Sequence, residues 1–187
     1  MINEINKALE VLKNGGVILY PTDTIWGIGC DATNEKAVER IYEIKQRSDQ
    51  KSMLVLLDHA GKIPTYISEM PEIAWDLIEL TEKPLTIIYP GAKNLAKNLI
   101  ANDGSIGIRI TNEPFTNKLI QRLRKPIVST SANVSGEKSP LNFAEINPKL
   151  FDLVDYVVQW RQDDLTPSQP SGIIKLQVNG EIEIIRK

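Results

Sequence analysis

Residues 1–21, MINEINKALEVLKNGGVILYP, set the pattern of the fold. Apolar residues recur at helical spacing from Ile5 to Leu12, and Gly15-Gly16 predicts the end of that helix. The apolar run at residues 17–20 then predicts a short buried strand, which Pro21 closes. The chain therefore starts with a helix followed by a strand, as α/β proteins commonly do.

The same alternation continues to the end of the chain. A second helix, capped by Thr33 or Asn34, is expected to end near Arg47, because turn residues follow it. Further helical segments are predicted at residues 71–80, near Leu95, at 115–123 and at 143–150. Further strands are predicted at residues 53–57, 85–89, 106–110, 127–129, 156–158 and 172–176.

A hairpin at the C-terminus decides the kind of sheet. Asn179-Gly180 lies between two alternating apolar runs, which is a strong signal for a β-hairpin. A hairpin is antiparallel, whereas strands joined through helices are usually parallel. We therefore expect an α/β fold in which helices pack on a mixed parallel/antiparallel sheet, with residues 1–187 forming a single domain.

The composition excludes several classes of site. Cys30 is the only cysteine and His59 the only histidine, so neither an intramolecular disulfide nor a zinc site of Cys and His ligands can form. No apolar run is long enough to span a membrane, and the N-terminal residues lack the core of a signal peptide, so a cytoplasmic location is expected. The net charge of −2 leaves little excess for a broad basic face that would bind a long nucleic acid.

The familiar nucleotide-binding signatures are absent or out of place. The sequence holds no P-loop motif. Gly27-Ile-Gly29-Cys-Asp-Ala32 fits the loose dinucleotide pattern G-x-G-x-x-A, but such a loop should join a strand directly to a helix. Here the helix begins only after Asn34, so Gly27 and Gly29 are interpreted as ordinary turn glycines.

Two polar segments directly follow predicted strands. In open α/β sheets, ligands bind beyond the carboxyl ends of strands, so hydroxyl groups there are well placed to meet one. The first segment, Pro21-Thr-Asp-Thr-Ile-Trp-Gly27, is also compatible with a plain turn. The second, Ser129-Thr-Ser-Ala-Asn-Val-Ser-Gly136, carries five side chains that can form hydrogen bonds. A helix cap needs one of them, which favours a binding role for the second segment.

Basic residues form two further candidate features. Lys45 and Arg47, at the end of a predicted helix, can clamp a polyphosphate together with Lys51, although surface cations that complement the helix dipole are the alternative. Arg109 lies inside an otherwise apolar strand, with no acidic residue beside it in the sequence. An unpaired buried charge is costly, so Arg109 either binds a ligand or lies on a solvated edge strand.

Together and in this order, these segments resemble the YrdC/TsaC family of threonylcarbamoyl-AMP synthases. The resemblance runs from Gly16 to Arg186. It is carried by five pieces: Pro21-Thr-Asp-Thr-Ile-Trp-Gly27, Lys45-Gln-Arg47, Gly107-Ile-Arg109, Ser131-Ala-Asn133 and the late Ser171 before an apolar strand. It implies a short, single-domain member with a twisted, mixed α/β fold and a positively lined cavity.

The resemblance also implies roles for individual residues. The catalytic pair is Lys45 and Arg47. Threonine contacts are implied for Thr24, Arg109, Ser129 and Ser171. ATP contacts are implied for Arg47, Lys51, Ser131, Asn133, Ser139 and Arg186.

The implied activity is the condensation of L-threonine, bicarbonate or CO2, and ATP into threonylcarbamoyl-AMP, with release of pyrophosphate. The product then serves threonylcarbamoyladenosine modification of tRNA by a transferase complex. Mg²⁺ is expected to arrive with ATP, held by phosphates and water, with no protein metal site. One alternative is a double-stranded RNA or tRNA-binding module of the same fold without adenylate-forming activity, and weak RNA binding is also expected as an additional property. The other alternative is an enzyme with carbamoyl-AMP-type chemistry, or a paralogue of the same fold that uses another amine.

Overall fold

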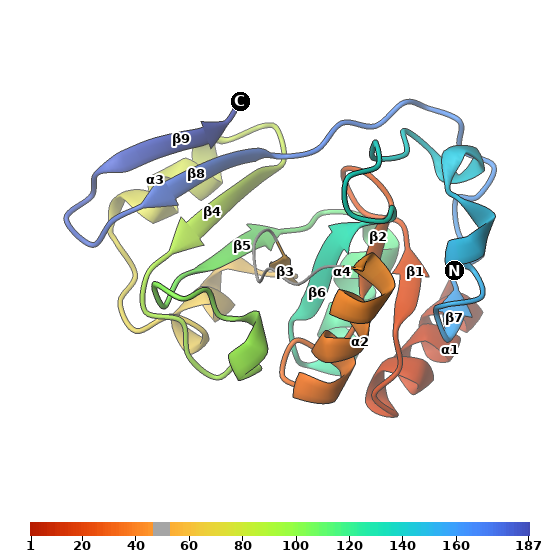
Figure 1. The fold of residues 1–187 in the computed structure, drawn as a ribbon. Helices are drawn as coiled ribbons and strands as arrows, with labels where there is room; N and C mark the ends of the chain where they lie inside the picture. The colour runs from red at the N-terminus through yellow and green to blue at the C-terminus, as the bar shows by residue number, and fades with distance from the viewer. Residues whose placement is uncertain (47–52) are drawn as a thin grey trace.

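The computed structural model of the protein describes residues 1–46 and 53–187 (Figure 1). Within these residues the strands form a nine-stranded sheet in the order β7-β1-β2-β6-β3-β5-β4-β8-β9. The strands are β1 (Ile18–Tyr20), β2 (Gly27–Gly29), β3 (Leu54–Leu57), β4 (Leu85–Tyr89), β5 (Ile106–Ile110), β6 (Ile127–Ser131), β7 (Tyr156–Val157), β8 (Gly172–Leu176) and β9 (Ile182–Arg186).

The sheet is mixed, as predicted. β1 pairs with β7, β3 with β5 and β4 with β8 in parallel, and the five other neighbouring pairs are antiparallel. β8 and β9 form the predicted C-terminal hairpin, with Gly180 in the left-handed conformation that its turn requires. The segment between β7 and β8 crosses the molecule from one end of the sheet towards the other (Figure 1).

β2 was not predicted, and it corrects the interpretation of Gly27 and Gly29 as turn glycines. Both lie in a strand between β1 and β6. A Cβ atom on Gly29 would lie only 2.2 Å from the carbonyl oxygen of Val128 and 2.7 Å from the Tyr20 ring, so a glycine is needed where these strands approach closely. The strand escaped prediction because three residues with two glycines carry no β-propensity signal.

Helices cover both faces of the sheet. α1 (Ile2–Lys13) and α4 (Pro114–Leu123) share one apolar cluster with Tyr20 and Leu56. α2 (Glu35–Lys45) packs on the opposite face against Val55, where η1 (Ala60–Thr65) and α3 (Ile73–Leu80) also lie, over β4 and β5. Each fully buried aliphatic or aromatic side chain contributes roughly 1.5–3 kcal/mol to these layers.

The helix boundaries agree with the sequence in most places. Asn34 caps α2, since its side chain accepts hydrogen bonds from Lys36 N and Ala37 N, and the helix ends at Lys45. The helix predicted at residues 143–150 is wrong: η3 (Phe143–Glu145) and η4 (Pro148–Leu150) are separate 3-10 turns, and a third, η2 (Lys97–Leu99), lies near Leu95. Pro148 explains the interruption, because proline disfavours helical geometry at the residue before it.

Candidate active site

A cavity of about 230 Å³ opens on the face of the sheet that carries α1 and α4. Seven of the predicted site residues line it, although they come from segments far apart in the sequence. They are Thr24, Arg109, Ser129, Ser131, Ser139, Ser171 and Arg186. The remaining lining residues include Thr130 and the apolar residues Trp26, Leu54 and Ile173.

The register of the sheet explains this gathering. Paired residues on neighbouring strands point to the same face, and alternate residues along a strand point to opposite faces. Leu54 pairs with Ser129, and in the next row Thr86 of β4 pairs with both Arg109 and Ile173. The long segment after β7 brings Ser171 to the same place, where its Oγ lies 2.8 Å from Oγ1 of Thr86.

The loop between β1 and β2 is held as a tight hydroxyl turn. Thr22 Oγ1 donates to the carbonyl of Ile25 at 2.8 Å and accepts from Thr24 N at 3.0 Å. It also lies 3.0 Å from Thr24 Oγ1. Because the single proton of Thr22 Oγ1 goes to Ile25, Thr24 must donate in that contact, which leaves the lone pairs of its oxygen to accept a hydrogen bond from a ligand.

Arg109 is 4% exposed and has an acidic partner, which corrects the expectation from its sequence neighbours. Its Nη2 lies 3.0 Å from Oδ1 of Asp23, without hydrogen-bond geometry, and donates to Thr22 Oγ1 at 3.4 Å. β5 lies between β3 and β4, so the edge-strand alternative is wrong. Nε of Arg109 is buried without a hydrogen-bond partner among the described residues, so the guanidinium keeps a donor available.

Arg186 is the second cation of the cavity. Its Nε donates to the carbonyl of Ser171 at 2.9 Å. Desolvation lowers the pKa of Arg186 below its ordinary value, and the positive charge of Arg109 adds to this effect. No carboxylate stands among the described residues that line the cavity. An anionic ligand between the two guanidinium groups would relieve their mutual repulsion.

Lys45 is placed differently from the expectation. It is 2% exposed and is not among the lining residues. Its Nζ donates to the carbonyl oxygens of Ser131 at 2.6 Å and Asn133 at 2.5 Å, and to Oδ1 of Asn133 at 2.8 Å. In turn, Ser131 Oγ lies 2.5 Å from Asn133 Oδ1. Lys45 therefore fixes the end of β6 and the loop after it, and Asn133 lies behind the cavity wall.

Arg47 and Lys51 lie outside the described residues. The structure therefore does not test the predicted three-cation clamp.

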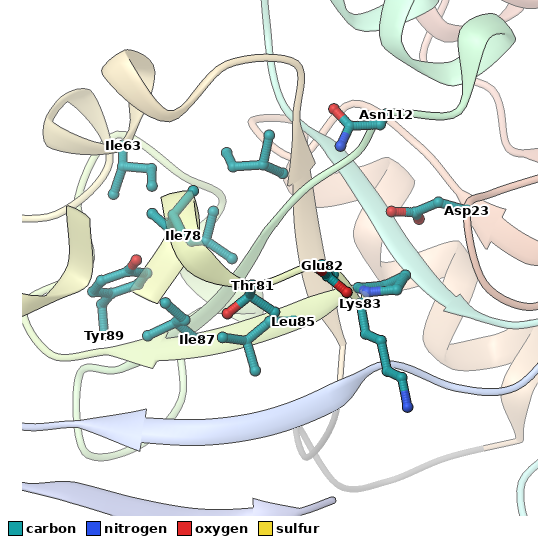
Figure 2. Close-up of a pocket in the computed structure, with 13 residues that line it drawn as sticks. Asp23, Ile63, Ile78, Thr81, Glu82, Lys83, Leu85, Ile87, Tyr89 and Asn112 are labelled. Atoms are coloured by element: carbon teal, nitrogen blue, oxygen red, sulfur yellow. The ribbon is translucent and has the colours of Figure 1, made fainter. Parts of the chain in front are cut away.

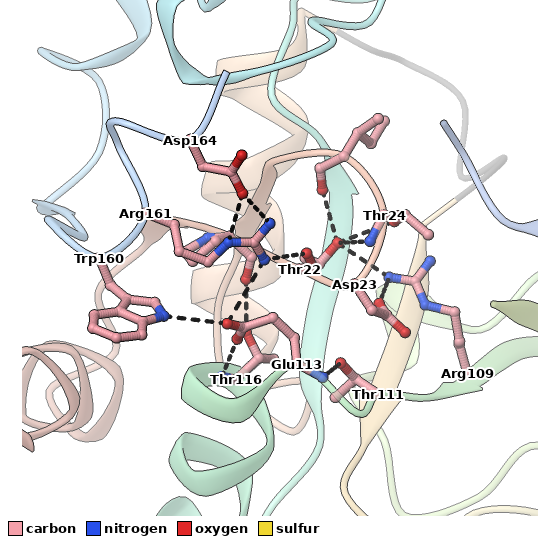
Figure 3. Close-up of polar contacts among 12 residues, drawn as sticks. Thr22, Asp23, Thr24, Arg109, Thr111, Glu113, Thr116, Trp160, Arg161 and Asp164 are labelled. Atoms are coloured by element: carbon pink, nitrogen blue, oxygen red, sulfur yellow. Dashed lines mark hydrogen bonds and ion pairs between the residues drawn. The ribbon is translucent and has the colours of Figure 1, made fainter. Parts of the chain in front are cut away.

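A buried polar network supports the Thr22 turn from behind (Figure 3). Thr116 Oγ1 donates to the carbonyl of Pro21 at 2.7 Å, and Arg161 donates to the carbonyl of Thr22 at 3.4 Å. Glu113 caps α4 by accepting from Thr116 N at 2.7 Å, and it also accepts from Trp160 Nε1 at 3.3 Å. Burial raises the pKa of Glu113 above its ordinary value.

The sequence analysis missed this support. Arg161 lies in the left-handed region at φ 64°, which is uncommon for a residue other than glycine, and ion-pairs with Asp164 at 2.8 Å. Nothing in the local sequence marks Trp160 or Arg161 as support for the turn, because Glu113 and Thr22, which they contact there, are more than 45 residues away along the chain.

The described residues contain neither a membrane-spanning helix nor a cluster of metal ligands. None of their helices is long and apolar enough to cross a membrane. Within the same residues, no group of three or more His, Cys, Asp or Glu side chains could hold a metal ion.

A family model and curated relatives match most of the chain. The family model of Sua5, YciO and YrdC proteins, described as telomere recombination, matches residues 10–187. The threonylcarbamoyl-AMP synthase of Pseudoalteromonas translucida (strain TAC 125) is 35% identical over 182 residues, which cover 95% of this chain and 95% of that protein.

Solved structures show the same fold. The chain resembles E. coli YciO with a TM-score of 0.86 and 27% identity, over 100% of this chain and 90% of that one. It resembles P. abyssi Sua5, solved in complex with L-threonine, with a TM-score of 0.82 and 24% identity. That match covers 92% of this chain but 50% of Sua5, so the chain spans about half of the Sua5 length.

Proposed function

The chain belongs to the Sua5/YciO/YrdC family, and from this membership we propose that it is an L-threonylcarbamoyladenylate synthase. The enzyme is a nucleotidyltransferase that condenses L-threonine, bicarbonate or CO2, and ATP, with release of pyrophosphate. The product serves threonylcarbamoyladenosine modification of tRNA. The activity fits a single domain at residues 1–187.

One observation carries the proposal. A single cavity gathers two guanidinium groups and six hydroxyl-bearing residues, and no carboxylate among its described lining. Threonine carries a carboxylate and ATP a triphosphate, and the reaction brings the carbamate formed from threonine towards that triphosphate. A site made of cations and neutral hydrogen-bonding groups suits that reaction, because catalysis then consists of alignment and charge stabilisation.

Threonine is assigned to the inner part of the cavity. Arg109 binds the α-carboxylate, since it is buried and keeps an unsatisfied Nε donor. Thr24 has lone pairs to accept a hydrogen bond from the amine or hydroxyl of threonine. Ser129 and Ser171, both nearly buried, complete the polar contacts.

ATP is assigned to the side of the cavity formed by the end of β6 and by β9. Ser131, Ser139 and Arg186 line this side. Asn133 belongs to it through its contact with Ser131. Arg47 and Lys51 remain assigned to the phosphates from the sequence alone. Lys45 holds Ser131 and Asn133 through its ammonium group, so in place of the expected catalytic contact we assign it a positioning role.

The chemistry has two steps. The amine of threonine adds to CO2, or to bicarbonate with loss of water, and gives up a proton to form a carbamate. A carbamate oxygen then attacks the α-phosphorus of ATP, a new P–O bond forms, and the bond to the leaving pyrophosphate breaks. The guanidinium groups offset the repulsion between the carbamate and the triphosphate.

Mg²⁺, the downstream partner and the location belong to the same proposal. The cavity offers no carboxylate ligand among its described residues, so Mg²⁺ would be held by phosphates and water, and would neutralise phosphate charge. The product would pass to a tRNA-modifying transferase complex, and any RNA binding by this chain would be weak. A cytoplasmic location is part of the same proposal.

Pyrophosphate release tests the assignment. The purified protein is given L-threonine, bicarbonate and ATP, with each omitted in turn, and the adenylate is identified by mass spectrometry. Release should require all three, because the nucleophile is the adduct of the first two. Equal release from ATP alone would indicate a simple hydrolase, and steep, salt-dependent RNA binding without turnover would favour an RNA-binding module.

A further inference from the structure

A second, larger cavity of about 450 Å³ lies on the opposite face of the same strands (Figure 2). Its floor is formed by Ile87 and Tyr89 of β4 and by Ile108 of β5, which point away from the candidate active site. Its roof is formed by Ile63 of η1 and Ile78 of α3. The floor and the roof of the cavity are therefore apolar, and its volume falls in the range of small-molecule sites.

The inner end of this cavity holds an unsatisfied polar group. Tyr89 is 1% exposed, and its hydroxyl has no hydrogen-bond partner in the described structure. Figure 2 shows this hydroxyl pointing towards Ile78. A buried hydroxyl without a partner is costly, and a phenol can both donate and accept a hydrogen bond. The hydroxyl itself is covered in this structure, so a ligand would satisfy it after a small shift of the side chains or of α3 above it.

The outer end is polar and the roof is loosely packed. Figure 2 shows Asp23 and Asn112 at one end of the cavity, far from Tyr89, and Glu82 and Lys83 also contribute to the lining. In α3, only Ala74 is buried, so the helix over the cavity has few contacts that would resist a small displacement. Apolar space inside a protein can hold a small aromatic molecule such as benzene.

We propose that this cavity is an accessory binding site for a small planar molecule with an apolar body and one hydrogen-bonding group, which meets the Tyr89 hydroxyl. The apolar body packs between α3 and the floor formed by β4 and β5. The site is separate from the candidate active site, because the two cavities share no lining residue, although Asp23 of the second cavity forms an ion pair with Arg109 of the first. The proposal does not depend on the reaction.

Methyl NMR provides a direct test, with indole as the probe. Five isoleucines line the cavity: Ile63, Ile78, Ile87, Ile108 and Ile110. Their labelled δ1 methyl signals should shift in a saturable way on addition of indole. The methyl signals of Ile5 and Ile18, which pack in the cluster around α1, should not shift. The absence of saturable shifts at the cavity methyls, up to the solubility limit of indole, would overturn the proposal.

Tyr89→Phe tests the polar contact. The variant should bind indole about twofold to tenfold more weakly, because it loses one hydrogen bond, and should bind the isosteric hydrocarbon indene with unchanged affinity. Its melting temperature should equal or exceed that of the wild type, since an unsatisfied hydroxyl has been removed. Equal loss of indole and indene binding, or no loss of either, would contradict the role of the phenol.

A matched pair of substitutions tests whether indole binds in the second cavity. Ile78→Trp places the indole ring of the new side chain in the second cavity. Because that ring takes the space of the ligand, free indole should bind at least tenfold more weakly. Ile173→Trp introduces the same ring into the candidate active site and should leave indole binding unchanged. Equal indole affinity in both variants would refute the location.

Discussion

Replacement of Arg109 by lysine is the sharpest test of the threonine site. The substitution keeps the positive charge beside Asp23, but an ammonium group cannot reproduce the fork of a guanidinium. In the structure Nη2 already lies 3.0 Å from Asp23, while Nε has no hydrogen-bond partner among the described residues. A lysine that stays with Asp23 therefore loses the donor that we assign to the ligand carboxylate. One charge-assisted hydrogen bond is worth roughly 1.5–3 kcal/mol, so threonine should bind about 10- to 100-fold more weakly.

The assay measures both substrate affinities and the melting temperature on one preparation. Isothermal titration should show the loss for threonine, while ATP binding changes less than about threefold, because the triphosphate has its own cations. Arg122→Lys is the matched control, since Arg122 lies on the exposed side of α4 and donates a hydrogen bond to Asn6 Oδ1. Unchanged threonine affinity in a folded Arg109→Lys protein would remove Arg109 from the site. A parallel fall of both affinities and of the melting temperature would make the residue structural.

Three further predictions concern other parts of the chain. Arg47→Ala should weaken ATP binding by roughly 10- to 100-fold and leave threonine binding intact. Unchanged ATP affinity by calorimetry would show that Arg47 is a solvated surface cation and not a phosphate ligand. Gly29→Ala should destabilise the protein by about 1–3 kcal/mol, because the new Cβ would lie 2.2 Å from the Val128 carbonyl oxygen, whereas Gly172→Ala, with an ordinary 3.5 Å contact, should melt near the wild type. The hydrogen bond from Lys175 lowers the pKa of Asp103 from 3.8 to about 2, so this pair stabilises the folded state above about pH 4 and loses that contribution as the pH falls towards 2. Lys175→Gln should thus lower the free energy of unfolding in urea at pH 5 but not at pH 2, and an equal loss at both values would contradict the linkage.

The strands and helices could largely be predicted because their signals are local. The bounds of β4, β5 and β8 agree with the sequence to the residue. Asn179-Gly180 correctly indicated the hairpin that makes the sheet mixed. The two wrong predictions also have local causes. β2 is too short and too rich in glycine to show the alternation of apolar residues that marks a strand. Pro148 interrupts an apolar pattern that otherwise fits a helix.

The residues of the candidate site could be named from their types and order, but their partners could not. Lys45 and Arg47 looked equivalent in the sequence, yet the end of α2 turns Lys45 inward to the carbonyl oxygens after β6. Arg109 looked unpaired because Asp23 is 86 positions away along the chain.

The sequence by itself thus determined the element types, the mixed sheet and the set of polar residues at the strand ends. Only the tertiary structure decided which of these residues share a cavity, because the register between strands distant in sequence places Ser129, Arg109 and Thr86 on one face. The same register places Tyr89 on the other face, beneath α3. Side-chain alternation is a local property, but the choice of neighbour is set by packing over the whole sheet, which no short stretch of sequence encodes.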